Sequence, residues 1–400
     1  MRIVHLIPSL DPQQGGPPRV AAALAAATAT LGHEVSLIAY TPHDRLDATR
    51  LAYQDTPGLD DVVQLTPEPL RRSAALPLAK PHRLYDGVLL TWLNAADIVH
   101  LHGLWEHHVF HASKAARQTR TPYIITPHGM LDPWSLQQKR LKKKLALALG
   151  YRRMLNHAAG LHLLNDDEQR LIEPLKLRTP TFILPNGIFL DEIDSPPPED
   201  ATPENLTPDD TSEAVPTLPP GTPYILFLSR LHFKKGLDIL AEAFVRVAEA
   251  RPEIHLVVAG PDGGAQAGLE QAIADAGLSD RVHLPGLVVG RDKINLIRGA
   301  RLFCLPSRQE GFSMAITEAL ACATPVVITD ACHFPEVAEH DAGRVTSVEP
   351  EPIAQAILET LASPEAAVQQ GQRGRALVEA RYTWPQIAQR LVEQYRSLGR

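Results

Sequence analysis

Twelve short apolar runs, six on each side of a proline-rich stretch, constrain the fold of this 400-residue chain more than any other feature. A turn and an amphipathic helical pattern follow most of the runs, and this repetition is typical of parallel sheets covered on both faces. We therefore predict an α/β protein with two Rossmann-like, doubly wound domains that face a central cleft, where the carboxyl ends of the strands bind ligands. The runs are RIVHLI, EVSLIAY, DIVHLHG, YIITPHG, GLHLL and TFILP in the first half, and YILFLS, IHLVVAG, RVHLPG, RLFCLPS, PVVITD and AGRVTS in the second.

The proline-rich stretch, residues 195–223, divides the chain. It holds six acidic residues, no Lys or Arg and nine prolines, so it accounts for most of the net charge of −7. A segment this acidic and proline-rich builds no core and is predicted to be a linker or insertion. We expect an N-terminal domain at 1–194, a C-terminal domain at 224–380, and a final helix at 381–400 that packs back on the first domain.

Composition narrows the class of protein. The chain is 44% hydrophobic and 21% charged, which is ordinary for a soluble globular protein. Three cysteines form no C-x-x-C motif, and the N-terminal apolar run is too short for a signal peptide, so a cytoplasmic location is expected. No apolar stretch approaches the roughly 18 residues that a membrane span needs. An aromatic content of 5% argues against nucleic-acid binding.

The stretch RQEGFSMAITEAL places two glutamates, Glu310 and Glu318, on either side of a predicted helix N-terminus. Glu310 falls in the turn after the RLFCLPS run, whereas Glu318 lies inside the helix that follows. The amides of residues 312–314 would be unpaired donors at the helix start, a position that favours phosphate. The spacing predicts a ligand with hydroxyl groups at both ends and phosphate in the middle.

Two further loops follow predicted strands. SRLHFKKG comes directly after YILFL and places Arg230 and Lys235 on a loop at a carboxyl strand end. Two cations near a pyrophosphate would each contribute about 4 kcal/mol before desolvation, so no metal ion is expected to be required. GGPPRV, with Gly15 and Gly16, lies between the first strand and its helix and allows close approach of a ligand to the backbone.

Taken in order, GGPPRV, SRLHFKKG and the E-x7-E of EGFSMAITE resemble the retaining family 4 glycosyltransferases of the GT-B fold, the group 1 glycosyltransferases of bacterial surface-polysaccharide type. HGLW at 102–105, PHGM at 127–130 and PNGI at 185–188 extend the resemblance over nearly the whole chain. The resemblance implies sugar transfer, with retention of configuration, from a nucleoside-diphosphate sugar to a glycan or lipid-linked acceptor. The proline-rich insertion is the one departure from the pattern.

The resemblance also implies roles for the matched residues. Glu318 would bind the ribose of the donor and Glu310 the hydroxyl groups of the transferred sugar. Arg230 and Lys235 would hold the diphosphate. His128 would act at the reacting sugar, because histidine donates or accepts a hydrogen bond near neutral pH. The remaining expected donor contacts are Gly15, Gly16, Leu287, Gly311, Phe312, Ser313 and Met314, and the expected acceptor-side residues are Arg19, His102 and Trp105.

His107 and His111, one helical turn apart, raise a competing metal interpretation. Zinc sites usually add a third protein ligand, and no H-E-x-x-H order is present, so we expect no metal here. A nucleotide-sugar epimerase of similar architecture, or a transferase with a small soluble acceptor, remains an alternative function. An NAD-binding protein would need a dinucleotide fingerprint, which the sequence lacks.

Residues 139–153, KRLKKKLALALGYRR, form a basic amphipathic pattern. Leu141, Leu145, Ala148 and Leu155 can share one helical face, which we expect to pack on the core, with the lysines on the other face. Such a helix either presents a solvated basic face or docks on an anionic bilayer. Because many members of the resembled family act on lipid-linked acceptors, we expect a peripheral contact with the inner leaflet of the plasma membrane.

Overall fold

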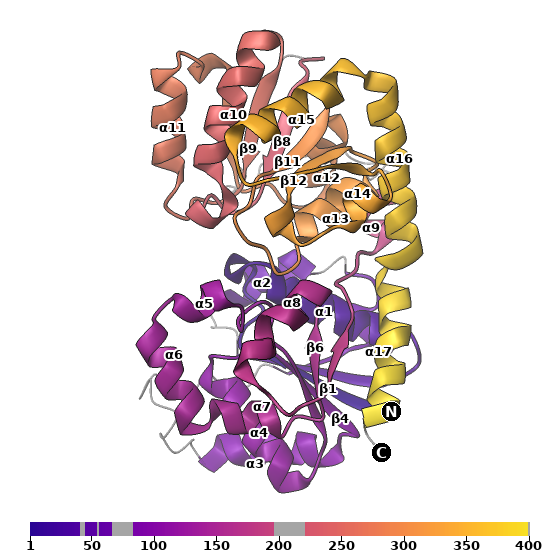
Figure 1. Ribbon diagram of the computed structural model, residues 1–400. Coiled ribbons are helices and arrows are strands. Elements are labelled where there is room, and N and C mark those ends of the chain that lie inside the picture. The colour runs from indigo at the N-terminus through magenta and orange to yellow at the C-terminus, as the bar shows by residue number, and fades with distance from the viewer. Residues whose placement is uncertain (41–44, 54–55, 66–82, 196–220, 399–400) are drawn as a thin grey trace. The chain divides into compact units, whose positions relative to one another are not determined.

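The computed structural model describes residues 1–40, 45–53, 56–65, 83–195 and 221–398 (Figure 1). Most of the proline-rich stretch predicted as a linker lies outside these residues. The chain divides into two compact units. Unit 1 comprises residues 1–189 and 384–400, and unit 2 comprises residues 190–383.

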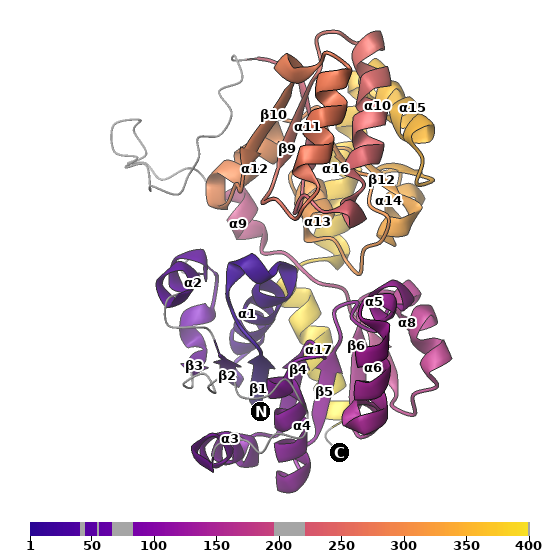
Figure 2. The ribbon, with the colours of Figure 1, turned by 90° about the vertical axis from the view of Figure 1, so that its left-hand side faces the viewer.

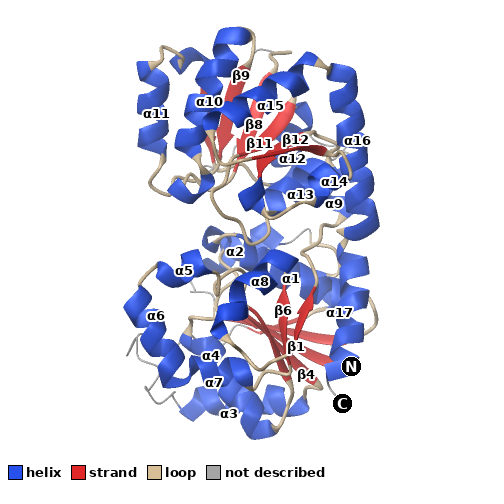
Figure 3. Cartoon of the chain, viewed as in Figure 1, coloured by secondary structure: helices blue, strands red, loops and turns tan. Residues whose placement is uncertain are grey.

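Unit 1 is built on a parallel sheet with the strand order β3-β2-β1-β4-β5-β6-β7. Figure 3 shows helices on both faces of this sheet, as buried parallel strands require. The strands are β1 Arg2–Ile7, β2 Glu34–Ala39, β3 Val63–Leu65, β4 Ile98–His102, β5 Tyr123–Thr126, β6 Gly160–Leu163 and β7 Thr181–Ile183. The helices are α1 Gly16–Ala29, α2 Leu46–Tyr53, α3 Arg83–Ala95, α4 His107–Thr119, α5 Pro133–Gln137, α6 Arg140–Ala146, α7 Arg152–Asn156, α8 Asp166–Ile172 and α17 Trp384–Leu398.

Unit 2 repeats the design with the order β10-β9-β8-β11-β12-β13, again all parallel. Figure 2 shows α10 and α11 next to each other in this unit. The strands are β8 Tyr224–Leu228, β9 His255–Ala259, β10 Val282–Gly286, β11 Leu302–Leu305, β12 Val326–Thr329 and β13 Gly343–Thr346. The helices are α9 Leu190–Asp194, α10 Leu237–Ala250, α11 Gln266–Asp275, α12 Gly290–Gly299, α13 Met314–Ala321, α14 Glu336–Glu339, α15 Pro350–Ala362 and α16 Pro364–Arg381.

The chain order reverses direction within each sheet. In unit 1 the reversal lies between β1 and β4, and in unit 2 it lies between β8 and β11. In doubly wound sheets this reversal point is where loops diverge and ligands bind. The loops that carry the predicted donor residues Lys235 and Glu310 leave β8 and β11, on the two sides of the reversal in unit 2.

The C-terminal helix α17 belongs to unit 1, although α16 before it belongs to unit 2. The amide of Trp384 donates to the carbonyl of Ile188 at 3.1 Å. Gly187 of the PNGI motif makes this approach possible, because a Cβ atom there would lie 2.8 Å from the Trp384 nitrogen. The motif therefore seats the start of the last helix.

The expected end of the first domain, at residue 194, differs from the structure by five residues. Helix α9 groups with unit 2 because Asp194 and the carbonyl of Ile193 bind arginines of that unit. Arg375 forms a two-pronged ion pair with Asp194 at 2.6 and 2.9 Å. A pairing of this geometry is specific as well as strong.

Candidate active site

The β8 and β11 loops of unit 2 are joined tightly. Gly236, with φ of 73°, follows Lys235 and immediately precedes α10, and a Cβ atom at this position would lie 2.0 Å from the carbonyl oxygen of Pro306. Only glycine fits both the backbone angle and the contact. Arg308 adds a two-pronged ion pair to Asp238, with both distances 2.7 Å. The glycine that ends the FKKG sequence thus brings the predicted cation loop against the predicted carboxylate loop.

Glu310 is buried and already has partners. Its Oε1 accepts from Lys235 Nζ at 2.6 Å and from Ser307 Oγ at 2.5 Å. Burial alone would raise the pKa of this carboxyl, but the charge of Lys235 and the hydrogen bonds from Lys235 and Ser307 hold it below its usual value. Glu310 is therefore an anion with one oxygen occupied.

Glu318 is the fifth residue of α13 and is also buried. Its Oε1 accepts from Lys293 Nζ at 2.7 Å, and only 13% of the Lys293 side chain is exposed. Lys293 comes from α12 and was not identified from the sequence. Each of the two predicted carboxylates thus lies in a buried ion pair with a lysine from a different segment.

In the sequence, α13 begins between the two ion-paired glutamates, Glu310 and Glu318. Ser313 is the residue before the helix and is buried, and the amides that follow it open the helix without intrahelical partners. The Phe312 ring packs 5.6 Å from Phe334 and 6.0 Å from Tyr382, which fixes the turn. Gly311 and Met314 flank these residues and are half-buried, whereas Arg230 and Leu287 are exposed.

In unit 1, Gly16 opens α1 directly after β1 and a short helical turn. Pro17 and Pro18 follow Gly16 in the first turn of the helix, as the sequence predicts. Gly15 has φ of 94° and no described atom lies within 4 Å of a Cβ built at Gly15 or Gly16. Arg19, one turn into the helix, is half-buried.

His128 follows β5 at the carboxyl edge of the first sheet and adopts a left-handed backbone, with φ of 52°. Glu168 holds the adjoining backbone. Its Oε1 accepts from the Gly129 amide and its Oε2 from the Leu164 amide, both at 2.8 Å. Non-glycine residues in this conformation are strained by about 1–3 kcal/mol and need such support. Sequence reasoning missed Glu168, although Asn165 three residues earlier forms a helix-capping pattern with it.

A polar stripe crosses one face of the first sheet. It comprises His5 on β1, His100 and His102 on β4, Thr126 on β5 and His162 on β6, and all five side chains are buried. Burial is the main cause of the low pKa values: about 3 for His5 and His128 and about 4 for His162, while those of His100 and His102 lie well below the usual value. The histidines are therefore neutral at pH 7.

Two of the predicted acceptor-side residues have defined surroundings. His102 is completely buried beneath His128, to which its Nδ1 is hydrogen-bonded at 3.2 Å. His102 could therefore influence a ligand only indirectly, through its hydrogen bond to His128. Trp105 Nε1 donates to the Met130 carbonyl at 3.3 Å, and Lys143 Nζ lies 5.2 Å from the centre of the Trp105 ring.

Two groups of histidines bear on the metal question. His5, His100 and His102 have ring nitrogens within 4.8 Å of one another. However, the rings of His5 and His100 each lie within 21° of parallel to that of His102, so their in-plane lone pairs do not converge as a tetrahedral site requires. His107 and His111 face each other edge-on with ring centres 6.4 Å apart.

The basic segment differs from the predicted packing. Leu141 and Leu145 are 82% and 57% exposed, and only Leu155 of the expected apolar face packs within the core. The inward position of α6 is taken by Lys143, whose Nζ donates to the Ser135 carbonyl at 2.6 Å and lies over Trp105. A π-helical turn at Leu147–Tyr151, with Gly150 at φ of 157°, then changes the direction of the helical face.

The two parallel, doubly wound sheets, one in each unit, define a protein of the GT-B fold. The joined loops after β8 and β11 lie at the carboxyl ends of strands in the second sheet. Residues 209–377 match the family described as glycosyl transferases group 1, and residues 15–187 match the glycosyl transferase 4-like domain. These two matches cover most of the chain, which belongs to the family 4, group 1 glycosyltransferases.

Solved structures agree on the fold. HepE from Anabaena, crystallised with UDP and glucose, has a TM-score of 0.74 at 20% identity and covers 99% of this chain and 100% of its own. Sucrose-phosphate synthase from Thermosynechococcus elongatus has a TM-score of 0.71 at 19% identity, with 100% and 99% covered.

Curated relatives match over shorter stretches. A GDP-mannose-dependent monoacylated α-(1-6)-phosphatidylinositol monomannoside mannosyltransferase from Corynebacterium glutamicum is 31% identical over 53% of this chain and 55% of its own length. A D-inositol 3-phosphate glycosyltransferase from Xylanimonas cellulosilytica is 30% identical over 53% of this chain and 50% of its own length. The chain thus spans about half the length of these relatives. Within the described residues, no helix is long and apolar enough to cross a membrane.

Proposed function

We propose that this protein transfers a sugar from a nucleoside-diphosphate sugar to a hydroxyl group of a glycan or lipid-linked acceptor, with retention of anomeric configuration. The observation that carries this proposal is the pair of buried carboxylate–lysine contacts, Glu310 with Lys235 and Glu318 with Lys293, on the two sides of the α13 N-terminus. Carboxylates recognise hydroxyl groups, whereas lysines and helix-terminal amides recognise phosphate.

Each group has a defined part in this proposal. Glu318 accepts hydrogen bonds from the ribose, and the free oxygen of Glu310 accepts from hydroxyls of the transferred sugar. The diphosphate lies at the α13 amides, where Lys235 and Arg230 add positive charge. Lys235 is then shared between Glu310 and the diphosphate, which lets it neutralise charge on the leaving group as the glycosidic bond breaks.

Retention follows if the acceptor hydroxyl attacks C1 from the face that the diphosphate leaves, through an oxocarbenium-like state. The bond from C1 to the acceptor oxygen forms as the bond from C1 to the diphosphate oxygen breaks, and the hydroxyl proton passes to the departing diphosphate. In that scheme Glu310 stabilises positive charge at C1 and positions the sugar, and no covalent intermediate with the protein is required. His128 is proposed to contact the reacting sugar as a neutral imidazole, in keeping with a pKa of about 3 that burial imposes.

The test is a panel of nucleotide sugars incubated with the whole chain, with and without lipid-linked and soluble saccharide acceptors. Transfer predicts release of nucleoside diphosphate together with a glycosylated acceptor, and no change of the donor sugar when the acceptor is omitted. An epimerase would instead alter the nucleotide sugar in the absence of acceptor. Absence of any glycosylated product with every donor and acceptor class would contradict the proposal.

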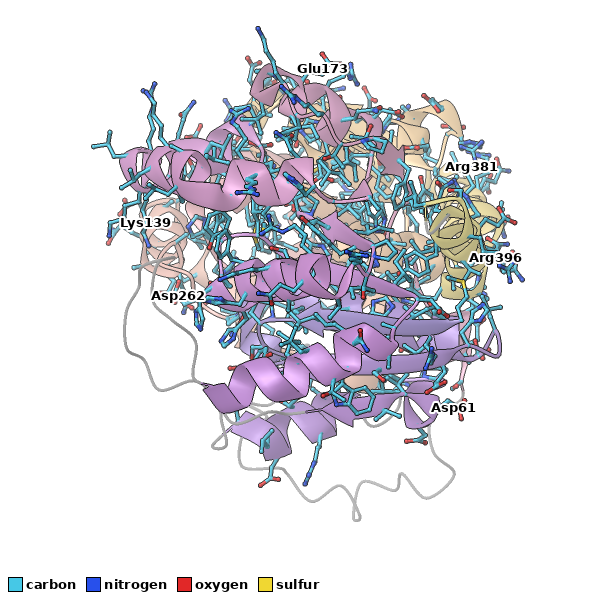
Figure 4. All side chains as sticks on the ribbon, turned by 90° about the horizontal axis from the view of Figure 1, so that it is seen from below. Asp61, Lys139, Glu173, Asp262, Arg381 and Arg396 are labelled. Atoms are coloured by element: carbon cyan, nitrogen blue, oxygen red, sulfur yellow. The ribbon has the colours of Figure 1, made fainter. Side chains whose placement is uncertain are left out.

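A contact with an anionic membrane is a second part of the proposed function. The outward face of α6 combines the exposed Leu141 and Leu145 with the exposed Lys142 and Lys144. Lys139, which precedes α6, also lies at the surface (Figure 4). A hollow of about 540 Å³ adjoins this face and is lined by Leu136, Gln137, Arg140, Lys143, Lys144 and Leu147. Apolar side chains that project beside cations are the pattern of interfacial helices, and a role in surface-polysaccharide synthesis at the inner leaflet would fit it.

A further inference from the structure

Three histidines from separate parts of unit 1 form one hydrogen-bonded row. His5 Nδ1 lies 3.0 Å from His102 Nε2, and His102 Nδ1 lies 3.2 Å from His128 Nε2. His5 lies on β1 and His102 on β4, and these strands are neighbours in the sheet. His128 follows β5 at the sheet edge. The row therefore leads from the sheet interior to the residue proposed to meet the sugar.

Because all three rings are neutral, each carries a single N–H. His102 uses both of its ring nitrogens in the row, so it donates to one neighbour and accepts from the other. Only two arrangements satisfy both hydrogen bonds. In one, every ring is protonated at Nδ1 and donates toward His128; in the other, every ring is protonated at Nε2 and donates toward His5.

The inner end of the row distinguishes the two arrangements. His5 Nε2 is buried and has no hydrogen-bond partner among the described residues. If Nε2 carried the proton, a buried N–H donor would be left without an acceptor. Buried N–H groups without partners are rarer than unsatisfied acceptors. The arrangement with protons on Nδ1 is therefore favoured throughout the row. In this arrangement the Nδ1–H of His128 is not used by the row and can donate to a ligand.

A second row on the same sheet face has a different end and provides a comparison. The Leu184 carbonyl can only accept, so His162 donates to it from Nε2 at 2.8 Å. His162 Nδ1 then accepts from Thr126 Oγ1, which accepts from His100 Nε2, and His100 Nδ1 accepts from the Tyr395 hydroxyl. This row ends on the backbone and on α17, so it holds structure together without involving His128.

We propose that His5 and His102 are positioning residues that fix His128 in its Nδ1–H tautomer, so that His128 meets the substrate as a neutral hydrogen-bond donor to a sugar oxygen. The role at the sugar rests on the proposed glycosyl transfer, whereas the tautomer is a property of the free protein. Tautomers follow from the hydrogen-bond network and require direct measurement.

The measurement is long-range ¹H–¹⁵N NMR of the whole chain labelled at histidine, with His128 assigned from the signal that disappears in His128→Gln. We expect His128 to be protonated at Nδ1 and bare at Nε2. Two substitutions of His102 then differ in which neighbouring histidine the new side-chain amide can contact. In His102→Asn the side-chain amide occupies the place of Nδ1 and can still donate to His128, whereas in His102→Gln it occupies the place of Nε2 and faces His5.

His102→Asn should keep the Nδ1–H tautomer of His128 and most of kcat. His102→Gln should give mixed tautomers and a kcat lower by about 10-fold, the worth of one hydrogen bond, with unchanged affinity for nucleoside diphosphate. The matched control is His162→Leu, which removes an equally buried histidine of the second row. It should lower stability but leave the His128 tautomer and kcat unchanged.

An Nε2–H tautomer of His128 in the wild type would overturn the proposal, even if neither His102 variant folds. Identical tautomers and kcat values in His102→Asn and His102→Gln would also overturn it. If the tautomer is as expected but no donor and acceptor pair supports transfer, the proposed function fails while the assignment of the tautomer stands.

Discussion

At the residue scale, Glu318 is the side chain that we propose to bind the ribose of the donor. It is buried in α13 with one oxygen on Lys293, which leaves the other oxygen for a ribose hydroxyl. We predict that Glu318→Ala lowers the affinity for UDP or GDP by about 10- to 100-fold, since a hydrogen bond to a charged group contributes about 1.5–3 kcal/mol. Isothermal titration calorimetry measures the change.

Removal of Glu318 alone leaves Lys293 buried and unpaired, which costs stability on its own account. The double variant Glu318→Ala, Lys293→Met removes both partners and separates that effect from the loss of ribose binding. Glu270→Ala, at an exposed site on α11, is the matched control and should bind like the wild type. Unchanged nucleotide affinity in a folded Glu318→Ala variant would refute the assigned role.

The sequence singled out Glu310 and Glu318 as candidate ligand contacts, but it did not indicate the lysines with which they pair in the structure. Glu310 and Glu318 were identified because one precedes and the other follows a helix start within a single stretch. Lys293 was missed because it lies on α12, and no spacing in the sequence relates that helix to α13. Likewise, nothing in RIVHLI indicates that His5 bonds to His102, since this depends on the order of β1 and β4 in the sheet.

At the element scale, the twelve predicted strands are all present with ends within two or three residues of those expected. The prediction succeeded because buried parallel strands are continuous apolar runs, and the chain punctuates each one with a turn. Strand β3 was missed because its three residues, VQL, include a central glutamine and so do not form a continuous apolar run. The prediction for α6 was wrong about its buried face, because Lys143 takes the inward position through Ser135 and Trp105.

The corrected geometry of α6 sharpens the membrane prediction. Lys142 and Lys144 are exposed, whereas Lys143 is hydrogen-bonded to the Ser135 carbonyl and is left unchanged. We predict that Lys142→Gln, Lys144→Gln lowers partitioning to anionic vesicles by about 30-fold, since each lysine near such a surface contributes about 1 kcal/mol. The effect should shrink at high salt, where charges are screened. Co-sedimentation with vesicles measures it.

Two comparisons complete this test. Leu141→Ser, Leu145→Ser should also weaken binding, but with little dependence on salt, because the lost term is apolar burial. Lys114→Gln, at an exposed site on α4, changes a charge elsewhere in unit 1 and should bind like the wild type. A wild type that never pellets with anionic vesicles would contradict the proposed membrane contact, and a soluble acceptor would then be favoured.

At the scale of the whole molecule, the candidate site residues are distributed over both doubly wound units. Unit 2 carries the ion-paired carboxylates, the α13 N-terminus and the cations of the β8 loop. Unit 1 carries His128 on its strained backbone, with a row of neutral histidines behind it. The assignment of α17 to unit 1 through Trp384 and Tyr395 means that the chain passes between the units twice. The sequence predicted this return, but not the tyrosine–histidine bond that anchors it.

We propose that side chains and helix amides, without a divalent metal, stabilise the departing diphosphate during transfer with retention. The most direct measurement is the rate of transfer by the whole chain in excess EDTA, with the anomeric configuration of the product read by NMR. We expect an unchanged rate in EDTA and a product with the configuration of the donor sugar. Activity that disappears in EDTA and returns with magnesium or manganese, or a product of inverted configuration, would contradict it.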